Sequence, residues 1–192
     1  MGAEFELKYA ATPQQQEAIG EALDFSASIA METTYYDTPN GALSARRITL
    51  RRRLENGVSV CAVKTPGKGN LRGEWETESD NILSAAPVLC KLGCPVDLCS
   101  LTKNGLTAIC SARFTRQVKT VTLENCVVEI ALDRGVLIGG SKEQPLCEVE
   151  VELKSGCPEA AVAYAHGLAA KYGLQPEEKS KFRRALALAR GE

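Results

Sequence analysis

Hydrophobic and polar residues alternate in many short segments of this chain, which is typical of β-strands whose two faces meet different surroundings. Because successive side chains of a strand point to opposite faces, residues two apart share one face. The alternation recurs at residues 4–8, 31–38, 48–54, 58–65, 71–78, 106–123, 126–133 and 145–154. Turn signals at Asn56-Gly57 and Glu124-Asn125 predict hairpins. We also interpret Asp133-Arg134-Gly135 as a turn, followed by a short strand.

Helical patterns lie at the start, middle and end of the chain. Thr12, Pro13 and Gln15 supply a cap, a first-turn proline and a capping-box partner, which predicts a helix to about Leu23. Further helices are predicted at residues 81–92, from Pro158 to Gly173, and within 177–189, whereas residues 94–105 give no clear pattern. We therefore expect an α+β fold, an antiparallel sheet flanked by helices, in one domain that covers residues 1–192.

The composition excludes several classes of function. The formal net charge is −1, from 23 basic and 24 acidic residues, so no overall field favours nucleic acid or a membrane surface. No apolar run is long enough to span a membrane, and a cytoplasmic location is expected. The eight cysteines contain no CxxC pair and the chain has one histidine, so we expect reduced, structural cysteines and no zinc site.

Five of the predicted strands carry charged residues on one face and apolar or small residues on the other. The acidic positions gather on the first and last strands, and arginine is common on the middle ones. These positions are Glu4, Glu6 and Lys8; Arg51 and Arg53; Arg72, Glu74 and Glu76; Glu129 and Asp133; and Glu148, Glu150 and Glu152.

Two interpretations of these charged faces stay open at this point. An open sheet would turn them toward water, where cross-strand ion pairs contribute ~0.2–1 kcal/mol each. A closed sheet would turn them inward, around a wet channel with a basic and an acidic side. Arginine suits bidentate contacts with phosphate oxygens, and carboxylates without histidine or cysteine favour Mg²⁺ or Mn²⁺. The second interpretation predicts a channel for a di- or triphosphate chain.

The N-terminal Glu4-x-Glu6-x-Lys8 resembles the ExExK signature of the CYTH superfamily, the triphosphate tunnel metalloenzymes. ExExK alone is a weak motif, but an ordered set of further matches covers nearly the whole chain. These are Tyr36-Asp37-Thr38, Leu50-Arg51-x-Arg53, Val63-Lys64-Thr65, Arg72-x-Glu74-x-Glu76, Phe114-Thr115-Arg116, Val128-Glu129-x-x-Leu132-Asp133-x-Gly135, Cys147-Glu148-x-Glu150-x-Glu152-Leu153 and Ser180-Lys181. The second half most resembles bacterial inorganic triphosphatases, in which a helical CHAD domain often follows. Phe182-Arg183-Arg184-Ala185 departs from the Arg-Gly pair common in relatives, so the roles of Arg183 and Arg184 stay open.

The resemblance implies an eight-stranded antiparallel β-barrel, a tunnel with flanking helices, that hydrolyses inorganic triphosphate to diphosphate and phosphate. Mg²⁺ or Mn²⁺ would be held by Glu4, Glu6, Glu148, Glu150 and Glu152. The phosphate oxygens would be held by Lys8, Arg51, Arg53, Lys64, Arg72, Arg116 and Lys181. Glu4, Glu6 and Lys8 would be catalytic around a water nucleophile, while Glu74, Glu76, Glu129 and Asp133 would support the basic side chains.

Alternatives remain within and outside this family. The ligand could be another triphosphate-bearing small molecule, such as thiamine or nucleoside triphosphate, with hydrolysis or class IV adenylate cyclase-like chemistry. A non-catalytic polyphosphate-binding module is a third function, although a pure anion binder gains nothing from carboxylates that face its ligand. We expect no nucleic-acid or membrane partner, and the sequence leaves open both a homodimer and the choice between Mg²⁺ and Mn²⁺.

Overall fold

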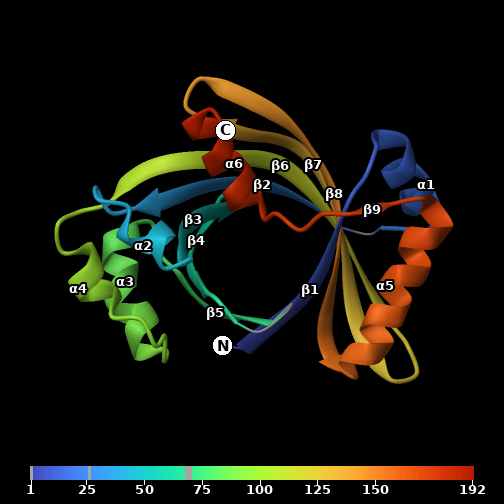
Figure 1. Cartoon of the computed structure of the whole chain (residues 1–192). Coiled ribbons are helices and arrows are strands. Elements are labelled where there is room, and N and C mark those ends of the chain that lie inside the picture. Colours follow the sequence, from blue (N-terminus) through green and yellow to red (C-terminus); the bar gives the residue numbers. More distant parts are fainter. Residues whose placement is uncertain (1, 26, 68–70) are drawn as a thin grey trace.

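The computed structural model describes residues 2–25, 27–67 and 71–192, and its strands form a closed antiparallel barrel (Figure 1). The ring runs β5-β4-β3-β2-β6-β7-β8-β1, and pairing between β1 and β5 closes it. The short β9 adds to the edge of β1. The strands are β1 (Gly2–Ala10), β2 (Ala27–Asp37), β3 (Thr49–Glu55), β4 (Val58–Thr65), β5 (Leu71–Glu78), β6 (Thr107–Thr122), β7 (Cys126–Gly139), β8 (Lys142–Gly156) and β9 (Gln175–Pro176). The eight-stranded barrel implied by the sequence is confirmed.

The helices begin and end largely where the sequence predicts. Helix α1 has the expected capping box, in which the Gln15 backbone N–H donates to the Thr12 hydroxyl at 3.2 Å and the Thr12 N–H donates to the Gln15 side chain at 2.8 Å. The helices are α1 (Pro13–Leu23), α2 (Ala42–Ala45), α3 (Ile82–Lys91), α4 (Leu98–Thr102), α5 (Pro158–Tyr172) and α6 (Lys181–Arg190). None of the helices within the described ranges has both the length and the apolar character that a membrane crossing requires.

The predicted turn at Asp133-Arg134-Gly135 is wrong, because β7 runs through these residues without a break. Gly135 is needed there because a larger residue would not fit against the neighbouring strand. A Cβ on Gly135 would collide with the backbone of Arg113 and Phe114 on the paired strand β6, so the two neighbouring strands leave no room for a side chain at this point. Asp133 consequently keeps a regular inward position on a strand, which brings its carboxylate into the barrel.

Three apolar clusters hold the barrel and its helices together. Helices α1 and α5 cover the outer faces of β1, β7 and β8, with Tyr9, Val149 and Ala165 in that core. Helices α3 and α4 cover the outer faces of β3, β4 and β5. Helix α6 packs at one end of the barrel, where Phe182 lies 5.2 Å from Tyr35 between ring centroids. On β1, β3, β5, β7 and β8 the apolar half of the pattern therefore faces outward, under helices, and the charged half faces the interior, whereas β2 and β6 also turn apolar side chains such as Met31, Tyr35 and Phe114 toward the cavity. All eight cysteines are free thiols.

Candidate active site

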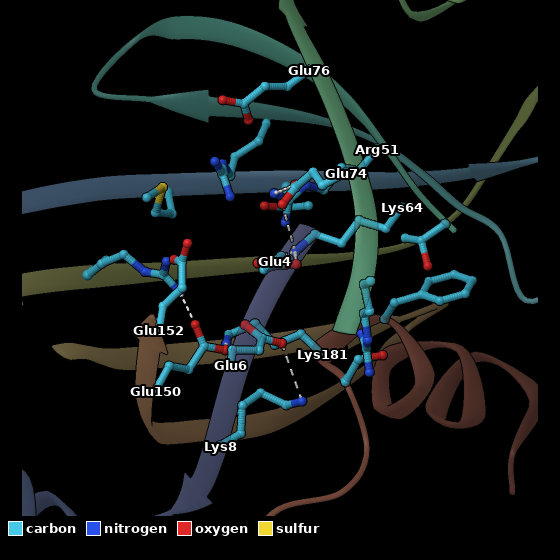
Figure 2. A pocket seen from close by; sticks show the side chains of 18 of the residues that line it. Glu4, Glu6, Lys8, Arg51, Lys64, Glu74, Glu76, Glu150, Glu152 and Lys181 are labelled. Atoms are coloured by element: carbon cyan, nitrogen blue, oxygen red, sulfur yellow. Dashed lines mark hydrogen bonds and ion pairs between the residues drawn. The ribbon is translucent and has the colours of Figure 1, made fainter. Parts of the chain in front are cut away.

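The inward faces of the strands enclose a charged cavity of about 370 Å³ (Figure 2). The interpretation of the charged faces as water-exposed surface is wrong, because the Lys8 and Glu6 side chains, for example, are only 8% and 12% exposed. Every predicted site residue except Glu148 lines this one cavity. The members are Glu4, Glu6, Lys8, Arg51, Arg53, Lys64, Arg72, Arg116, Glu150, Glu152 and Lys181.

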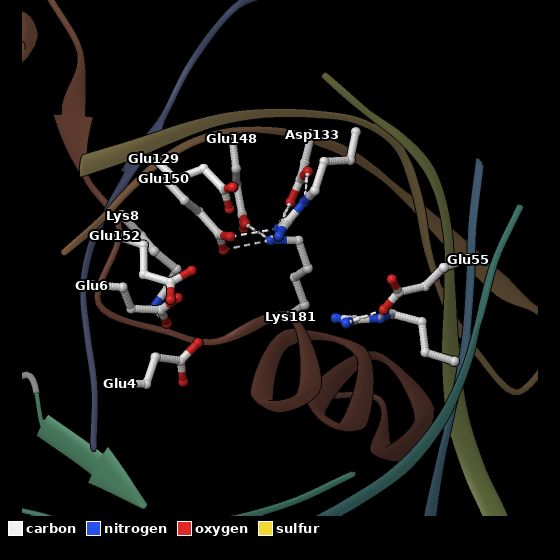
Figure 3. Close-up of polar contacts among 12 residues, drawn as sticks. Glu4, Glu6, Lys8, Glu55, Glu129, Asp133, Glu148, Glu150, Glu152 and Lys181 are labelled. Atoms are coloured by element: carbon white, nitrogen blue, oxygen red, sulfur yellow. Dashed lines mark hydrogen bonds and ion pairs between the residues drawn. The ribbon is translucent and has the colours of Figure 1, made fainter. Parts of the chain in front are cut away.

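The end of the cavity next to α6 contains a compact network of carboxylates and cations (Figure 3). The ammonium Nζ of Lys181 lies 2.8 Å from Asp133, 2.5 Å from Glu148 and 2.7 Å from Glu150. Arg116 donates two hydrogen bonds of 2.7 Å to the Asp133 carboxylate and a third, of 2.5 Å, to Glu150. The Lys181 ammonium donates hydrogen bonds to Glu148 and Glu150 and forms an ion pair with Asp133, so its charge is shared by three carboxylates.

This network stabilises the charged forms of Glu150 and Lys181. Burial alone would raise the pKa of Glu150, but the neighbouring Lys181 and Arg116 outweigh burial and hold that pKa well below its usual range. Burial would likewise lower the pKa of Lys181, and its three carboxylates hold it well above the usual value. Carboxylate oxygens of Asp133, Glu148 and Glu150 come within 4.8 Å of one another, as in a metal site. The Lys181 ammonium already lies among them, so we interpret the cluster as a lysine site.

Glu148 belongs to this network but does not line the cavity. Its side chain is fully buried, and it accepts hydrogen bonds from Lys181 and from Arg184, which lies one helical turn further along α6. Arg184 also lies 3.5 Å from Glu177. Arg184 is thus a site residue whose role the sequence left open. The spacing of three between Lys181 and Arg184, which places both on one helix face, is the signal that could have found it.

The opposite wall, on β3, β4 and β5, carries a second group of ion pairs. Lys64 lies 2.6 Å from Glu4 and 3.2 Å from Glu74, and Arg51 lies 3.0 Å from Glu74. Burial would raise the pKa of Glu74, yet Arg51 and Lys64 hold it below its usual value. Glu74 therefore supports two basic side chains, as the sequence indicated, and Asp133 does the same for Arg116 and Lys181. Arg53 has Glu55 as its partner at 2.5 Å.

Three carboxylates form a row across β1, β8 and β7. Strand register places Glu6 directly opposite Glu152, and Glu152 directly opposite Glu129. Directly opposite residues of neighbouring strands have Cβ atoms about 4.5–5.5 Å apart, and like charges so placed repel. Lys154 partly offsets this, at 3.1 Å from Glu152 and 3.3 Å from Glu129. Glu6 has a weaker partner in Lys8 at 3.6 Å. The donor set consists of carboxylate oxygens with no histidine or cysteine, which fits a hard divalent cation.

Comparison with known proteins agrees with this architecture. The family model of the CYTH domain matches residues 2–186. The inorganic triphosphatase of Haemophilus influenzae is 32% identical over 161 residues, which is 80% of this chain and 46% of that protein. This chain thus spans about half the length of that relative.

Solved structures show the same fold. HpAC1 from Hippeastrum, described as having a dominant triphosphatase activity, superposes with a TM-score of 0.68 at 21% identity, over 98% of this chain and 95% of that chain. PH1819 from Pyrococcus horikoshii gives a TM-score of 0.68 at 22% identity, over 96% and 99% of the two chains. With a family match over nearly its whole length, a relative at 32% identity and the same closed barrel, this chain belongs to the CYTH domain family.

Proposed function

We propose that this chain is a metal-dependent triphosphatase that hydrolyses inorganic triphosphate to diphosphate and phosphate. One observation carries the proposal: a single cavity of about 370 Å³ has a row of carboxylates across β1, β7 and β8 and basic side chains on β3, β4 and β6, which are held in place by carboxylates such as Glu74 and Asp133. A short polyanion that is bound by cations on one side and bridged by a metal to carboxylates on the other fits such a cavity. The similarity to the Haemophilus enzyme supports the same reaction class.

We assign the metal to the side of Glu6 and Glu152, with Glu4 and Glu150 as neighbours. Glu6 and Glu152 face one another across β1 and β8, and their cation contacts, Lys8 at 3.6 Å and Lys154 at 3.1 Å, are longer than the contacts of 2.5 and 2.7 Å that engage Glu150. When bound there, Mg²⁺ or Mn²⁺ would lower the pKa of a water molecule and neutralise charge on phosphoryl oxygens. Glu148, which the sequence placed among the metal ligands, is not part of the proposed metal site, because Lys181 and Arg184 occupy its oxygens.

The basic side chains would bind the phosphate oxygens of the substrate. Arg51, Arg53, Lys64 and Arg116 already line the cavity, held by carboxylates that orient them before the substrate arrives. Water would attack the terminal phosphorus, with a carboxylate of the Glu6 and Glu152 pair accepting its proton. The bond between that phosphorus and the bridging oxygen breaks, and diphosphate leaves with the bond's electrons. Cations around the departing group stabilise the charge that builds up on it.

The aromatic residues of the cavity favour an inorganic substrate over a nucleotide. Tyr35 and Phe182 pack against each other, with ring centroids 5.2 Å apart. Phe114 lies under the cations, 5.5 Å from the Lys181 ammonium and 5.9 Å from the Arg116 guanidinium. All three rings are therefore engaged within the protein, and none serves as a free surface on which a base would stack.

Phosphate release from tripolyphosphate, ATP and thiamine triphosphate, measured in parallel, tests the substrate. Each should be assayed with Mg²⁺, with Mn²⁺ and with EDTA. We expect the highest kcat/KM for tripolyphosphate with one of the metals, and no release with EDTA. Faster phosphate release from ATP or thiamine triphosphate would mean that the preferred substrate is an organic triphosphate and not inorganic triphosphate. Binding of tripolyphosphate without any release would favour the polyphosphate-binding module instead.

A matched pair of variants tests the site. Glu6→Gln removes one charge from the carboxylate row and should lower kcat by about a hundredfold or more, as loss of an essential charged group typically does. Glu143→Gln is the control, because its side chain is 54% exposed and forms only a surface pair with Arg113. Equal activity of the two variants would contradict the assignment of the carboxylate row.

A further inference from the structure

Two lysines that line the cavity each lie between carboxylates, but their surroundings differ. The Lys181 ammonium lies 2.8, 2.5 and 2.7 Å from three carboxylates, and its side chain is 10% exposed. The Lys154 ammonium lies 3.1 Å from Glu152 and 3.3 Å from Glu129, and its side chain is 40% exposed. The first lysine is therefore enclosed by its partners, whereas the second is held at longer distances and is partly open to solvent.

A β-bulge of β8 coincides with Lys154. Between Val127 and Val128 of β7 the strand register skips one residue of β8, and that residue is Lys154. A bulge adds a residue to one strand, bends that strand and can redirect a side chain. The Lys154 side chain lines the cavity and contacts Glu152 of its own strand and Glu129 of the neighbouring strand. The bulge thus lies at the point where one ammonium is shared by carboxylates of two strands.

Burial decides how readily each lysine can be separated from its carboxylates. Partly exposed ion pairs contribute little to stability, because water screens them and long side chains lose freedom when they pair. A buried ion pair is costly to break, since removal of one partner leaves the other charge uncompensated. A divalent cation that binds to carboxylates of this cavity would therefore displace Lys154 at a small cost, whereas displacing Lys181 would be expensive.

The charges of the carboxylate row match such an exchange. Figure 3 shows Glu6, Glu152 and Glu129 along one side of the barrel. Their ion-pair partners within the described chain are Lys8, at 3.6 Å from Glu6, and Lys154. Two ammonium groups leave one of the three negative charges unbalanced. A divalent cation in exchange for Lys154 would, together with Lys8, balance all three.

We propose that Lys154 is the internal counter-ion of the carboxylate row and competes with the divalent metal for the oxygens of Glu129 and Glu152. This inference rests on the proposed function, because that function assigns the metal to this row. Glu129, which the sequence assigned to the support of basic side chains, thereby becomes a residue of the metal site. The competition lowers the metal affinity of the site, and it compensates the repulsion between the carboxylates while no ion is bound.

Titration of Mn²⁺ into the metal-free protein, without any triphosphate, tests the proposal. The electron paramagnetic resonance signal of free Mn²⁺ measures how much of the ion is bound. Lys154→Met removes the charge and keeps a long side chain, so we expect it to lower the Kd for Mn²⁺ by about tenfold. Lys154→Arg keeps the positive charge and should stay within about twofold of wild type. Lys103→Met is the matched control, because Lys103 is exposed beside α4 and is not a lining residue of the cavity.

A double-mutant cycle separates competition at Glu129 from a general effect of charge. In the Glu129→Gln background, Lys154 keeps only one of its two carboxylates. Adding Lys154→Met there should lower the Kd by about threefold, a smaller gain than in the wild-type background. Equal gains in the two backgrounds would overturn the proposal, because Lys154 would then act on the ion without competing for Glu129.

Chemical labelling follows the Lys154 ammonium directly. Brief treatment with acetic anhydride, followed by mass spectrometry, measures the accessibility of each lysine. We expect Mn²⁺ to increase the labelling of Lys154 in a saturable manner, because the ion takes its two partners away. Labelling of the buried Lys181 should stay low, and labelling of the exposed Lys103 should not change. Labelling of Lys154 that does not respond to Mn²⁺ would overturn the proposal.

These measurements involve no turnover, so they are separate from the test of the proposed function. Equal Mn²⁺ affinities of wild type and Lys154→Met would overturn the counter-ion role, while phosphate release from tripolyphosphate would still support the triphosphatase. Tighter binding by Lys154→Met, in a protein whose wild type releases no phosphate, would support the counter-ion role and overturn the triphosphatase. Absence of Mn²⁺ binding in both proteins would overturn both proposals. Thermal unfolding confirms that each variant is folded.

Discussion

Some carboxylates of this protein stabilise the fold and others line the cavity of the proposed reaction. The hydrogen bonds that each carboxylate accepts show to which group it belongs. Asp37, within a motif that the sequence singled out, is 3% exposed and lies outside the main cavity. Its carboxylate accepts backbone N–H bonds from Thr38 at 2.7 Å, Leu43 at 2.9 Å and Ser44 at 3.0 Å, and a bond from the Ser44 hydroxyl. Asp37 thus caps α2 and fixes the connection from β2 to β3.

The capping role of Asp37 predicts a pH-dependent stability. Burial would raise the pKa of Asp37, but the bonds from Ser44, Leu43 and Thr38 outweigh it and hold the pKa below its usual value. A depressed pKa in the folded state stabilises the protein at pH values above the unfolded pKa, near 4, and this stabilisation is lost as the pH falls below that. Asp37→Asn should therefore lower the free energy of unfolding at pH 7 by about 1–3 kcal/mol.

Urea unfolding at several pH values between 3 and 7 measures this effect. The difference between wild type and Asp37→Asn should shrink toward the acid end. The exposed Asp80→Asn serves as the control, with a small and pH-independent change. A constant difference for Asp37→Asn across the series would show that its charge does not contribute.

Lys181 is a second residue whose surroundings make a sharp prediction. Its ammonium lies within 2.8 Å of three buried carboxylates, so Lys181→Met leaves them without their shared cation. Breaking a buried ion pair on one side costs about 3–5 kcal/mol, and we expect a loss of that size in chemical unfolding. Lys154→Met is the matched control, because Lys154 also contacts two carboxylates but is 40% exposed. A smaller loss at position 181 than at position 154 would contradict the network described here.

Alternation and capping predict most strands and helices of this protein, but they fail at Gly135, where the neighbouring strand β6 leaves no room for a side chain. The alternation in β1 and β8 predicts correctly which side chains face inward, and the Thr12 cap predicts the start of α1. Gly135 misled the interpretation because glycine marks both turns and close contacts between strands. The residues around it do not distinguish these cases, since the neighbour that needs the space, β6, is a separate strand.

Two glycine-to-alanine changes should therefore have opposite effects on stability. Gly135→Ala places a Cβ against the backbone of β6, and such overpacking should destabilise the protein by about 1–3 kcal/mol. Gly20 lies inside α1 with open space around its Cα, so Gly20→Ala should stabilise by about 0.5–1 kcal/mol. Midpoints of chemical unfolding compare the two. A stabilised Gly135→Ala variant would mean that β7 and β6 are further apart than described.

At the scale of the whole molecule, closing the sheet creates both the site and an electrostatic cost. The register of β1, β8 and β7 places Glu6, Glu152 and Glu129 in one row, and closure through β1 and β5 puts these like charges inside a cavity. Helix α6 supplies Lys181 and Arg184 at one end of this row of strands, but their charges are already engaged by Asp133, Glu148 and Glu150. The Glu6 side of the cavity keeps an excess of negative charge that a divalent cation would neutralise.

Metal binding should consequently stabilise the folded protein. We expect Mg²⁺ or Mn²⁺ to raise the melting temperature in a concentration-dependent way, because an ion that binds only the folded state shifts unfolding by mass action. EDTA should reverse the increase. Glu6→Gln should reduce the metal-dependent increase, whereas the surface variant Glu143→Gln should retain it in full. If Mg²⁺ or Mn²⁺ raised the melting temperature of both variants equally, the metal would have to bind outside the carboxylate row.

The sequence by itself determined most of the strands, the longer helices, the charged faces and the family resemblance, because alternation, capping and motif spacing are properties of neighbouring residues. Only the tertiary structure decided which charges meet. Lys181 lies 33 residues from Glu148 in the chain, and the structure joins them. Such pairings depend on strand register, barrel closure and the packing of α6, which bring together segments that are far apart in the chain.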